Sequence, residues 1–447
     1  MPTPAFKLRI LRAPVAFTVH SFTGFEAISQ PFVFEVDVTC RDNSLDMRGL
    51  MYQAAYLAFG NGKGGFHGQV QGVERRHFLP GPACYRLTLG PRMACLAQRH
   101  NQRVFQDCTA LEIIRRLLLE HGIRKDHYRF DLKTECQPRR YCAQYRETDL
   151  QLLQRLCAEE GIHYHFRHSR RDHVLVFGDG LRSFRRAPEA PFQSLPSVDG
   201  VRRFAVSHEQ AQTPGSRMQQ VAQGESTLPF LGAGQLLPLT GHPQQAWNHL
   251  WLVTEVRHQG SSHYRNQWQA APWEVGFRTH EAPRPERLLD MQRARVVDAV
   301  ADPDGRVRVQ FEWASQGHEC WLPVADHLQG RGPWRVGALV VVSFLEGDAD
   351  RPLITGCMPT GPMSVPVAQL PAPIEAGEGL EVWLDSQRLL GDERCLQVND
   401  DLKVSFEEDC QLLFRVGGST VELDRRSLRL AAPRLDLAYE RDKSPRG

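Results

Sequence analysis

The clearest fold signal in the sequence lies between Asp304 and Gly356. It begins with Asp-Gly-Arg-Val-Arg-Val-Gln-Phe-Glu-Trp (residues 304–313) and ends with Ser-Phe-Leu-Glu-Gly-Asp-Ala-Asp-Arg-Pro-Leu-Ile-Thr-Gly (residues 343–356). In the first run, apolar positions alternate strictly with polar ones. The apolar set is Val307, Val309, Phe311 and Trp313, and the polar set is Arg306, Arg308, Gln310 and Glu312. This period of two is typical of a strand with one buried face.

The second run predicts a strand, a turn and another strand. Residues 338–344 are nearly all apolar, which predicts a buried strand. Residues 346–350, Glu-Gly-Asp-Ala-Asp, are rich in types that tolerate positive φ and predict a turn. Pro352 then opens the next strand, where a missing N–H group costs least. Together the segments predict a small closed antiparallel barrel that carries no catalytic motif.

This block resembles the OB-fold neck of the VgrG proteins, the valine-glycine repeat spikes of bacterial type VI secretion systems. The residues that carry the resemblance are Gly305, Val307, Val309, Phe311, Cys320, Trp321, Glu346, Gly347, Asp348, Asp350, Arg351 and Pro352. Ala349 stands where the family usually has proline. The resemblance implies that these positions form a structural motif.

Composition limits the class of protein. A chain of 447 residues should form two to four domains. The net charge of +2 gives no reason to expect nucleic acid as a partner. Eleven cysteines, an odd number without a Cys-x-x-Cys pair, favour reduced thiols. The sequence shows neither a long apolar run nor a signal peptide, so we expect cytoplasmic assembly and export by another route.

The region before the barrel predicts short strands and then two helices. Strands are expected at 16–19, 32–38, 55–59, 66–70, 85–89, 162–168 and 174–177. The capping boxes of the helices are Thr109 with Glu112 and Thr148 with Gln151, and the terminating glycines are Gly122 and Gly161. The residues expected on the inward faces are Leu111, Ile114, Leu117, Leu118 and His121 in the first helix, and Leu150, Leu153, Leu156 and Cys157 in the second.

Segments of this region are similar to the VgrG hub domain. They are 105–114, 120–123, 145–150, 159–162 and 250–260. The resemblance implies a phage-hub-like domain over 1–285 and an OB-fold neck over 290–360.

Residues 361–379 are rich in proline and glycine and read as a linker. Beyond them, short alternating strands are expected at 380–384, 395–398, 402–406, 412–416, 420–423, 428–430 and 435–437. Asn399-Asp400 and Gly417-Gly418 are good turn dipeptides. Such short strands bury little alone, and copies of the chain could cover their edges. The family's stem is an intertwined three-chain β-prism, so the resemblance implies a short stem over 380–447. The expected fold class is mainly β with some helices.

Two groups of residues raise the question of chemistry. His163 and His165 would share one face of a strand, and with Cys157 they have the donor types of a zinc site. His168 would face the other way, and surface or half-buried histidines are the more ordinary interpretation. His318, Cys320 and His327 could form a similar site or a Cys-His nucleophile pair, although a packed thiol is the ordinary expectation for Cys320. We predict no catalytic, cofactor-binding or metal residues.

The resemblance implies a non-enzymatic homotrimer that acts as the spike of a type VI secretion tube. Its implied partners are an Hcp-type ring protein at the hub base, a PAAR-repeat tip protein and an effector or its adaptor at the stem, with transient contact to a target membrane and none to nucleic acid. The chain would leave the cell through the type VI apparatus. Two alternatives stay open: a spike that has evolved its own hydrolase or metal site, and the spike of a phage tail or another contractile injection particle.

Overall fold

The computed structural model describes most of the chain. The described residues are 6–13, 15–40, 45–76, 83–193, 195, 198–209, 219–275, 277, 287–298, 300–314, 319–329, 334–358, 381–384, 387–390, 395–397, 402–407, 411–416, 419–423 and 428–431. The chain separates into two compact units, Met1–Thr360 and Gly361–Gly447. Among the described residues, none of the helices combines the length and apolar character needed to cross a membrane.

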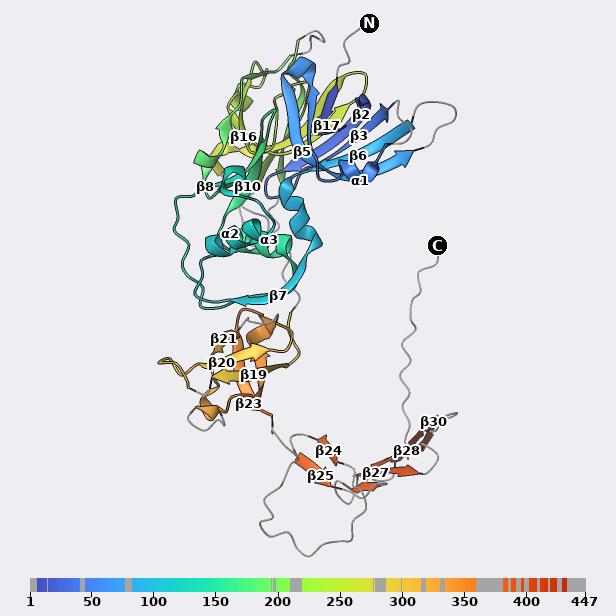
Figure 1. Ribbon diagram of the computed structural model, residues 1–447, viewed down its shortest axis with the longest axis vertical. Coiled ribbons are helices and arrows are strands. Elements are labelled where there is room, and N and C mark those ends of the chain that lie inside the picture. Colours follow the sequence, from blue (N-terminus) through green and yellow to red (C-terminus); the bar gives the residue numbers. More distant parts are fainter. Residues whose placement is uncertain are drawn as a thin grey trace, which may run out of the picture. The chain divides into compact units, whose positions relative to one another are not determined.

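One large sheet dominates the first unit (Figure 1). Its strands are β1 (Lys7–Ile10), β2 (Thr18–Ala27), β3 (Val33–Cys40), β4 (Ala54–Phe59), β5 (Gly64–Arg76), β6 (Ala83–Gly90), β12 (Arg185–Arg186), β13 (Ala190–Pro191), β14 (Val201–Glu209), β15 (Gln219–Ser226), β16 (Gln235–Thr240), β17 (Leu250–Gly260) and β18 (Tyr264–Pro272). The main order is β1-β4-β5-β6-β3-β2-β17-β18-β15-β14, and β16 pairs with β17, β12 and β13. The strands expected near the N-terminus are therefore present, but β2 is displaced and longer, and β1 was missed.

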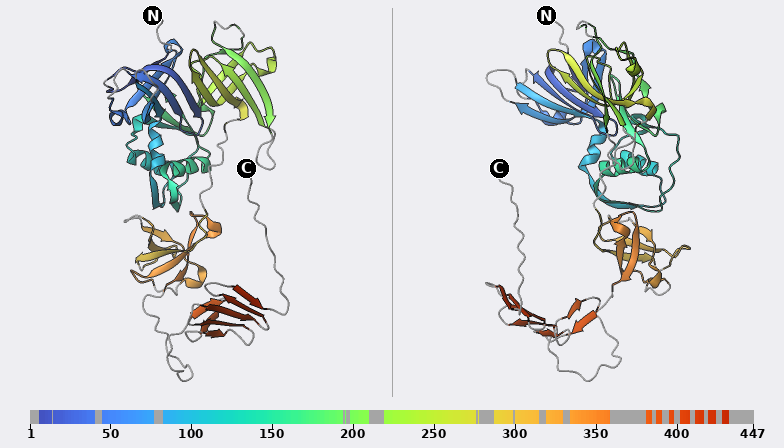
Figure 2. Two further views of the ribbon diagram at one scale, coloured as in Figure 1. Left: turned by 90° about the vertical axis from the view of Figure 1, so that its right-hand side faces the viewer. Right: turned by 180° about the vertical axis from the view of Figure 1, so that it is seen from behind.

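The large sheet has two curved halves, one from the first 90 residues and one from residues 185–272 (Figure 2). They join where β2 pairs antiparallel with β17, from Glu255↔Ala27 to Gly260↔Phe22. Buried polar groups cross this seam. His258 Nε2 lies 3.1 Å from Glu26 Oε1, and its Nδ1 lies 2.7 Å from the Tyr264 hydroxyl.

A smaller layer lies between the large sheet and the neck. It contains the sheet β10-β11-β8, with β8 (Tyr128–Asp131), β10 (His163–His168) and β11 (His173–Gly178), and the ribbon of β7 (His100–Phe105) with β9 (Cys142–Thr148). Its helices are α2 (Ala110–Glu120) and α3 (Asp149–Glu159), and the short α1 (Met47–Leu50) lies between β3 and β4 in the sequence. The 3-10 turns of the chain are Gly60–Gly62, Arg92–Gln98, Lys125–His127, Leu181–Ser183, Gln245–Trp247, Trp273–Val275, Asp326–Leu328 and Leu345–Gly347.

Both capping boxes are confirmed. Gly122 and Gly161 end the helices with φ of 72° and 66°, and the following amides close the last turns. Most of the predicted inward faces are confirmed, with Ile114, Leu117, Leu118, Leu153, Leu156 and Cys157 buried, but their limits differ. Ile113 and Leu152 are buried, whereas Leu111, Leu150 and His121 are only half-buried. The inward face of α3 also includes the charged residues Asp149 and Arg155.

The neck is a five-stranded antiparallel sheet in the order β21-β20-β19-β22-β23. The strands are β19 (Gln292–Asp298), β20 (Val307–Phe311), β21 (Glu319–Leu322), β22 (Leu339–Phe344) and β23 (Pro352–Cys357). A bridge between Val324 and Ile354 joins the two ends of the order, so the sheet curls into the expected barrel. The strand expected to be buried on both faces is instead half-buried. Val340, Val342 and Phe344 face the core, and the residues between them are partly exposed.

The second unit contains seven described strands in two sheets. They are β24 (Glu381–Leu384), β25 (Gln387–Leu390), β26 (Cys395–Gln397), β27 (Leu402–Glu407), β28 (Gln411–Val416), β29 (Ser419–Leu423) and β30 (Leu428–Ala431). β24 pairs with β25, and β26 to β30 form an antiparallel meander. The strand β25 was not predicted from the sequence. Both turn dipeptides and the last expected strand lie outside the described residues. Within one chain the strands pair with each other, so the three-chain prism stays a prediction.

Candidate functional site

The motif residues of the first neck strand form the core of the barrel. Val307, Val309 and Phe311 are at most 1% exposed, and Val309 pairs with the buried Cys320. The ring of Phe311 stacks on Trp313 at 4.7 Å. On the outer face, Arg308 pairs with Glu319 at 2.7 Å. The predicted register is thus confirmed, and Gly305 (φ 74°) supplies the turn before the strand.

The closing turn places two consecutive residues at positive φ, Glu346 at 57° and Gly347 at 76°. The positive φ at Gly347 favours glycine, and a side chain there would lie close to Arg287, at 3.1 Å. The carboxylate of Asp348 accepts from the Asp350 amide at 2.9 Å, and Arg351 lies 3.7 Å from Glu346. Pro352 opens β23, as expected.

Asp350 leaves the barrel and bonds to the hub. One carboxylate oxygen accepts from the backbone amide of Ala143 at 2.6 Å. The other accepts from Nη1 of Arg155 at 2.8 Å. Ala143 lies in β9 and Arg155 in α3, so a residue of the neck motif connects to two elements of the hub.

Arg155 is the centre of this contact and is almost completely buried. Its guanidinium also bonds to Glu147 at 2.8 Å, to Glu159 at 3.3 Å and to the carbonyl of Ala143 at 2.7 Å. Burial would lower the pKa of Arg155, but Asp350 and Glu147 raise it above its ordinary value, so the guanidinium stays charged. Burial raises the pKa of Asp350, against the opposing effect of Arg155.

A second contact joins the same ribbon to β21. The side chain of Gln106 donates to the carbonyl of Trp321 at 2.9 Å and accepts from its amide at 2.7 Å. The side-chain amide of Gln106 thus makes the two hydrogen bonds to Trp321 that the backbone of a neighbouring strand could make. Val104 and Ala143 of the ribbon belong to the hydrophobic core of the neck, and Tyr145 meets Trp313 edge-on at 5.1 Å. The hub and neck therefore share a core at this junction.

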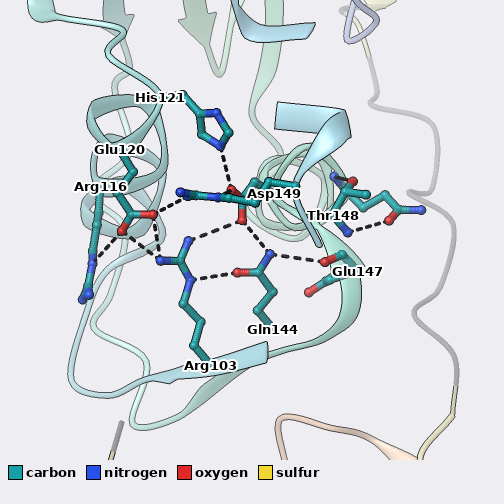
Figure 3. A network of polar contacts seen from close by, with 10 residues as sticks. Arg103, Arg116, Glu120, His121, Gln144, Glu147, Thr148 and Asp149 are labelled. Carbon is teal, nitrogen blue, oxygen red and sulfur yellow. Dashed lines mark hydrogen bonds and ion pairs between the residues drawn. The ribbon is translucent and has the colours of Figure 1, made fainter. Parts of the chain in front are cut away.

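Behind the ribbon, a polar network ties it to the two helices (Figure 3). Nη1 of Arg103 lies 2.8 Å from both oxygens of Glu120 at the end of α2. The completely buried Asp149 at the start of α3 accepts from His121 at 2.7 Å, from Gln144 at 2.8 Å and from Arg99 at 2.5 Å. Burial would raise the pKa of Asp149, but the hydrogen bonds from Gln144, His121 and Arg99 outweigh it and lower the pKa.

Among the described residues, His163, His165 and Cys157 are not brought together as a metal-binding group. His163 and His165 do share a face, with ring centroids 6.4 Å apart, but both are buried, so the surface interpretation is also wrong. His163 Nε2 lies 2.8 Å from the hydroxyl of Ser183. Neither ring nitrogen of His165 has a partner in the described part of the structure. Burial lowers the pKa of His163 to about 4 and of His165 to about 3.

Among the described residues, one group has the donor types and spacing of a metal site: His67, Asp172 and His173, which the sequence analysis missed. Nδ1 of His67 and Nδ1 of His173 are 3.0 Å apart. However, Nε2 of His173 accepts from the backbone amide of Arg92 at 3.1 Å, so its proton must be on Nδ1, pointing at His67. The Arg92 guanidinium also pairs with Asp172 at 2.6 Å. These bonds account for the cluster as a hydrogen-bonded chain and leave no free ligand atom on His173.

The Cys-His alternative is not supported for the described residues. Cys320 is buried in the neck, and burial raises the pKa of its thiol to about 12, which opposes thiolate formation. His327 is exposed in a 3-10 turn, and His318 lies outside the described residues.

The sequence analysis also missed the junction residues Arg155 and Gln106. The available signal for Arg155 was a charge between Leu153 and Leu156 on the inward face of an amphipathic helix. Gln106 lies in segment 105–114, which resembles the family's hub, but nothing in that segment indicates a contact with the neck.

Two protein families match the chain in the order of these domains. Residues 25–214 match the phage tail baseplate hub (GPD) family. Residues 292–358 match the type VI secretion system/phage-baseplate injector OB domain.

Curated relatives agree. The type VI secretion system spike proteins VgrG4b and VgrG5 of Pseudomonas aeruginosa are each 36% identical over 79% of this chain. The matches cover 56% and 57% of those proteins, so the chain spans little more than half their length. The actin cross-linking toxin VgrG1 of Vibrio cholerae is 28% identical over 76% of this chain and 40% of its own length.

Solved structures share the fold. The E. coli c3393 protein, a component of the type VI secretion system with structural similarity to the T4 phage tail proteins gp27 and gp5, superposes with a TM-score of 0.69 at 24% identity. The match covers 79% of this chain and all of that one. The lidded Francisella PdpA-VgrG complex gives a TM-score of 0.53 at 9% identity, covering 92% of this chain and 76% of the other. The chain is therefore a relative of the VgrG spike proteins, built on a phage-type baseplate hub domain followed by an injector OB domain.

Proposed function

We propose that the protein is the homotrimeric, non-enzymatic spike of a type VI secretion system, which punctures target envelopes and carries effectors. The observation that carries the proposal is one chain in which a baseplate hub domain is followed by an injector OB domain, at 36% identity to spike proteins. The junction between the domains supports a mechanical role, because buried ion pairs and a shared core join them.

The proposed partners follow the axis of such a spike. An Hcp-type ring protein would bind the hub base, and a PAAR-repeat tip protein with an effector or its adaptor would bind the stem. The motif residues of the neck would have a structural role only. The chain would assemble in the cytoplasm, leave through the type VI apparatus and contact a target membrane transiently. No nucleic acid is proposed as a partner.

Trimer formation is supported by the stem. In its described strands, the meander from β26 to β30 ends in two strands that each have one neighbour. Further copies could cover such open edges. Light scattering of the full chain should give about three times the mass of 50.8 kDa. A stable folded monomer at micromolar concentration would refute the trimer.

Deleting residues 362–447 tests the spike itself. The first compact unit ends at Thr360, so the truncated chain should still melt cooperatively. In a bacterial competition assay, cells that carry only this truncation should not kill prey, and cells complemented with the full chain should. Normal killing by the truncated chain would mean that the stem does not bear the tip.

The spike of a phage tail or another contractile injection particle is the second candidate, and the match to phage baseplate hubs favours it. The tube protein that co-purifies with the chain distinguishes this candidate from a type VI spike.

A spike with its own hydrolase or metal site is tested by metal analysis of the purified protein. We expect zinc well below one equivalent, and stoichiometric zinc would reopen that alternative.

A further inference from the structure

We propose that Arg155 and Asp350 are positioning residues, which clamp the β7–β9 ribbon onto the barrel and thereby fix the orientation of the neck on the hub. The inference goes beyond the proposed function, because it concerns the isolated protein and can be tested without a secretion system.

Covalent connectivity alone does not fix this orientation. The chain passes from hub to neck once, between the end of β18 at Pro272 and the start of β19 at Gln292. A single connection leaves two domains free to rotate unless non-covalent contacts hold them. The contacts that can do so are those of the ribbon with β21 and with the closing turn of the barrel.

The carboxylate of Asp350 connects the neck to the hub and is not part of the bonding within its own turn. Its described side-chain bonds go to Ala143 and Arg155, both in the hub. The barrel turn has its own internal bonds, through the carboxylate of Asp348 and the backbone of Leu345. The Asp350 carboxylate therefore accepts two charge-assisted hydrogen bonds from the hub. The turn does not need either bond for its own shape.

The ribbon is also held on its other side, which makes it a rigid connector. Successive residues of a strand face opposite sides, so Arg103 faces the helices while Val104 enters the neck core. Arg103 bonds to Glu120 of α2 and to Gln144 of β9 (Figure 3). A force on the barrel would thus reach α3 directly through Arg155 and α2 through Arg103 of the ribbon.

The experiment measures the hub–neck distance in the full chain. Genetically encoded spin labels at Leu119 on α2 and Val336 before β22 report on the two domains, since both side chains are about 70% exposed. Labelled chain is co-assembled with an excess of unlabelled chain, so that distances within one chain dominate the pulsed electron resonance signal.

Two junction variants and one matched control are compared. Asp350→Ala removes both acceptors, whereas Asp350→Asn keeps one oxygen for the Ala143 amide. The control, Asp302→Asn, removes a similar partly buried carboxylate whose partner, Arg306 at 2.7 Å, is also in the neck. Near-ultraviolet circular dichroism checks that each neck is folded.

We expect the distance distribution to broaden in the order wild type, Asp350→Asn, Asp350→Ala, and to stay narrow in the control. Hydrogen exchange of the 142–148 segment should be roughly tenfold faster or more in Asp350→Ala, in keeping with the loss of charge-assisted hydrogen bonds. A narrow, unshifted distribution in both folded Asp350 variants would overturn the proposal. Equal broadening in Asp302→Asn would also overturn it, because neck stability alone would then explain the effect. Either outcome leaves the proposed spike function untouched, since that rests on delivery and trimer assays.

Discussion

Acid should destabilise the hub, because His163 and His165 are buried in the neutral form. Both are 2% exposed, and burial lowers their pKa values from 6.5 to about 4 and about 3. The unfolded chain therefore takes up protons before the folded chain does. The stability that depends on these neutral rings is fully present above pH 6.5 and is lost as the pH falls toward the folded-state values.

The magnitude follows from the size of the shifts. At pH 5 the unfolded histidines are mostly protonated, whereas the folded ones remain neutral. Each histidine should then cost about 2 kcal/mol relative to pH 7.5, and the pair about 4 kcal/mol. A domain is typically stable by about 5–15 kcal/mol, so this loss is a large part of the total.

Urea denaturation of the full chain at pH 7.5 and pH 5 measures the effect, and His165→Leu isolates one histidine. Leucine has a similar volume, and neither ring nitrogen of His165 has a described hydrogen-bond partner to lose. The variant should be at least as stable as the parent at pH 7.5 and should lose about 2 kcal/mol less on acidification. His327→Leu, at an exposed site, is the control for a histidine-to-leucine substitution outside the buried pair. If His165→Leu and the parent lose the same stability at pH 5, the argument from buried neutral histidines is wrong.

Three further perturbations test the neck and the network. Phe311→Asp should unfold the barrel, because it removes a buried ring and buries a charge. Arg308→Asp should lower the free energy of unfolding by only about 1 kcal/mol, because Arg308 pairs with Glu319 at the surface. Equal thermal melts of the two variants would contradict the strand register. Glu346→Gly should stabilise the neck by about 1 kcal/mol in thermal denaturation, because glycine adopts a φ of 57° more easily than glutamate. A loss of stability would show that the ion pair of Glu346 with Arg351 outweighs this backbone strain. Asp149→Asn should lower the free energy of unfolding by about 2–3 kcal/mol in chemical denaturation, because a buried charged acceptor is lost and Arg99 and Arg103 keep only Glu120 as counter-ion; a change below about 1 kcal/mol would mean that Glu120 alone satisfies them.

The parts of the fold that were predictable from sequence are those with local signals. Alternation along β20 gave its buried face, and the capping boxes gave the starts of α2 and α3. Gly347 marked a turn with positive φ, although Glu346 beside it adopts the same conformation without being a residue type that favours it.

The junction could not be predicted, because its partners are distant in sequence. Asp350 was recognised as part of a motif, but Arg155 lies 195 positions before it, and neither residue indicates the other. The burial of His165 has the same origin. The strand pattern placed it beside His163, but the backbone at Gly234 covers the ring, and a side chain there would come within 2.7 Å of it. Such contacts depend on the tertiary arrangement and leave no periodic signal.

The seam between β2 and β17 has a consequence for the order of folding during synthesis. Glu26 and His258, which meet there, are 232 positions apart. The ribosome therefore exposes the edge of β2 long before β17 emerges to pair with it. Closing so long a loop is slow, and an open strand edge attracts other chains meanwhile. The hub should thus depend on chaperones early in its synthesis, and its two half-sheets should join only as a late step.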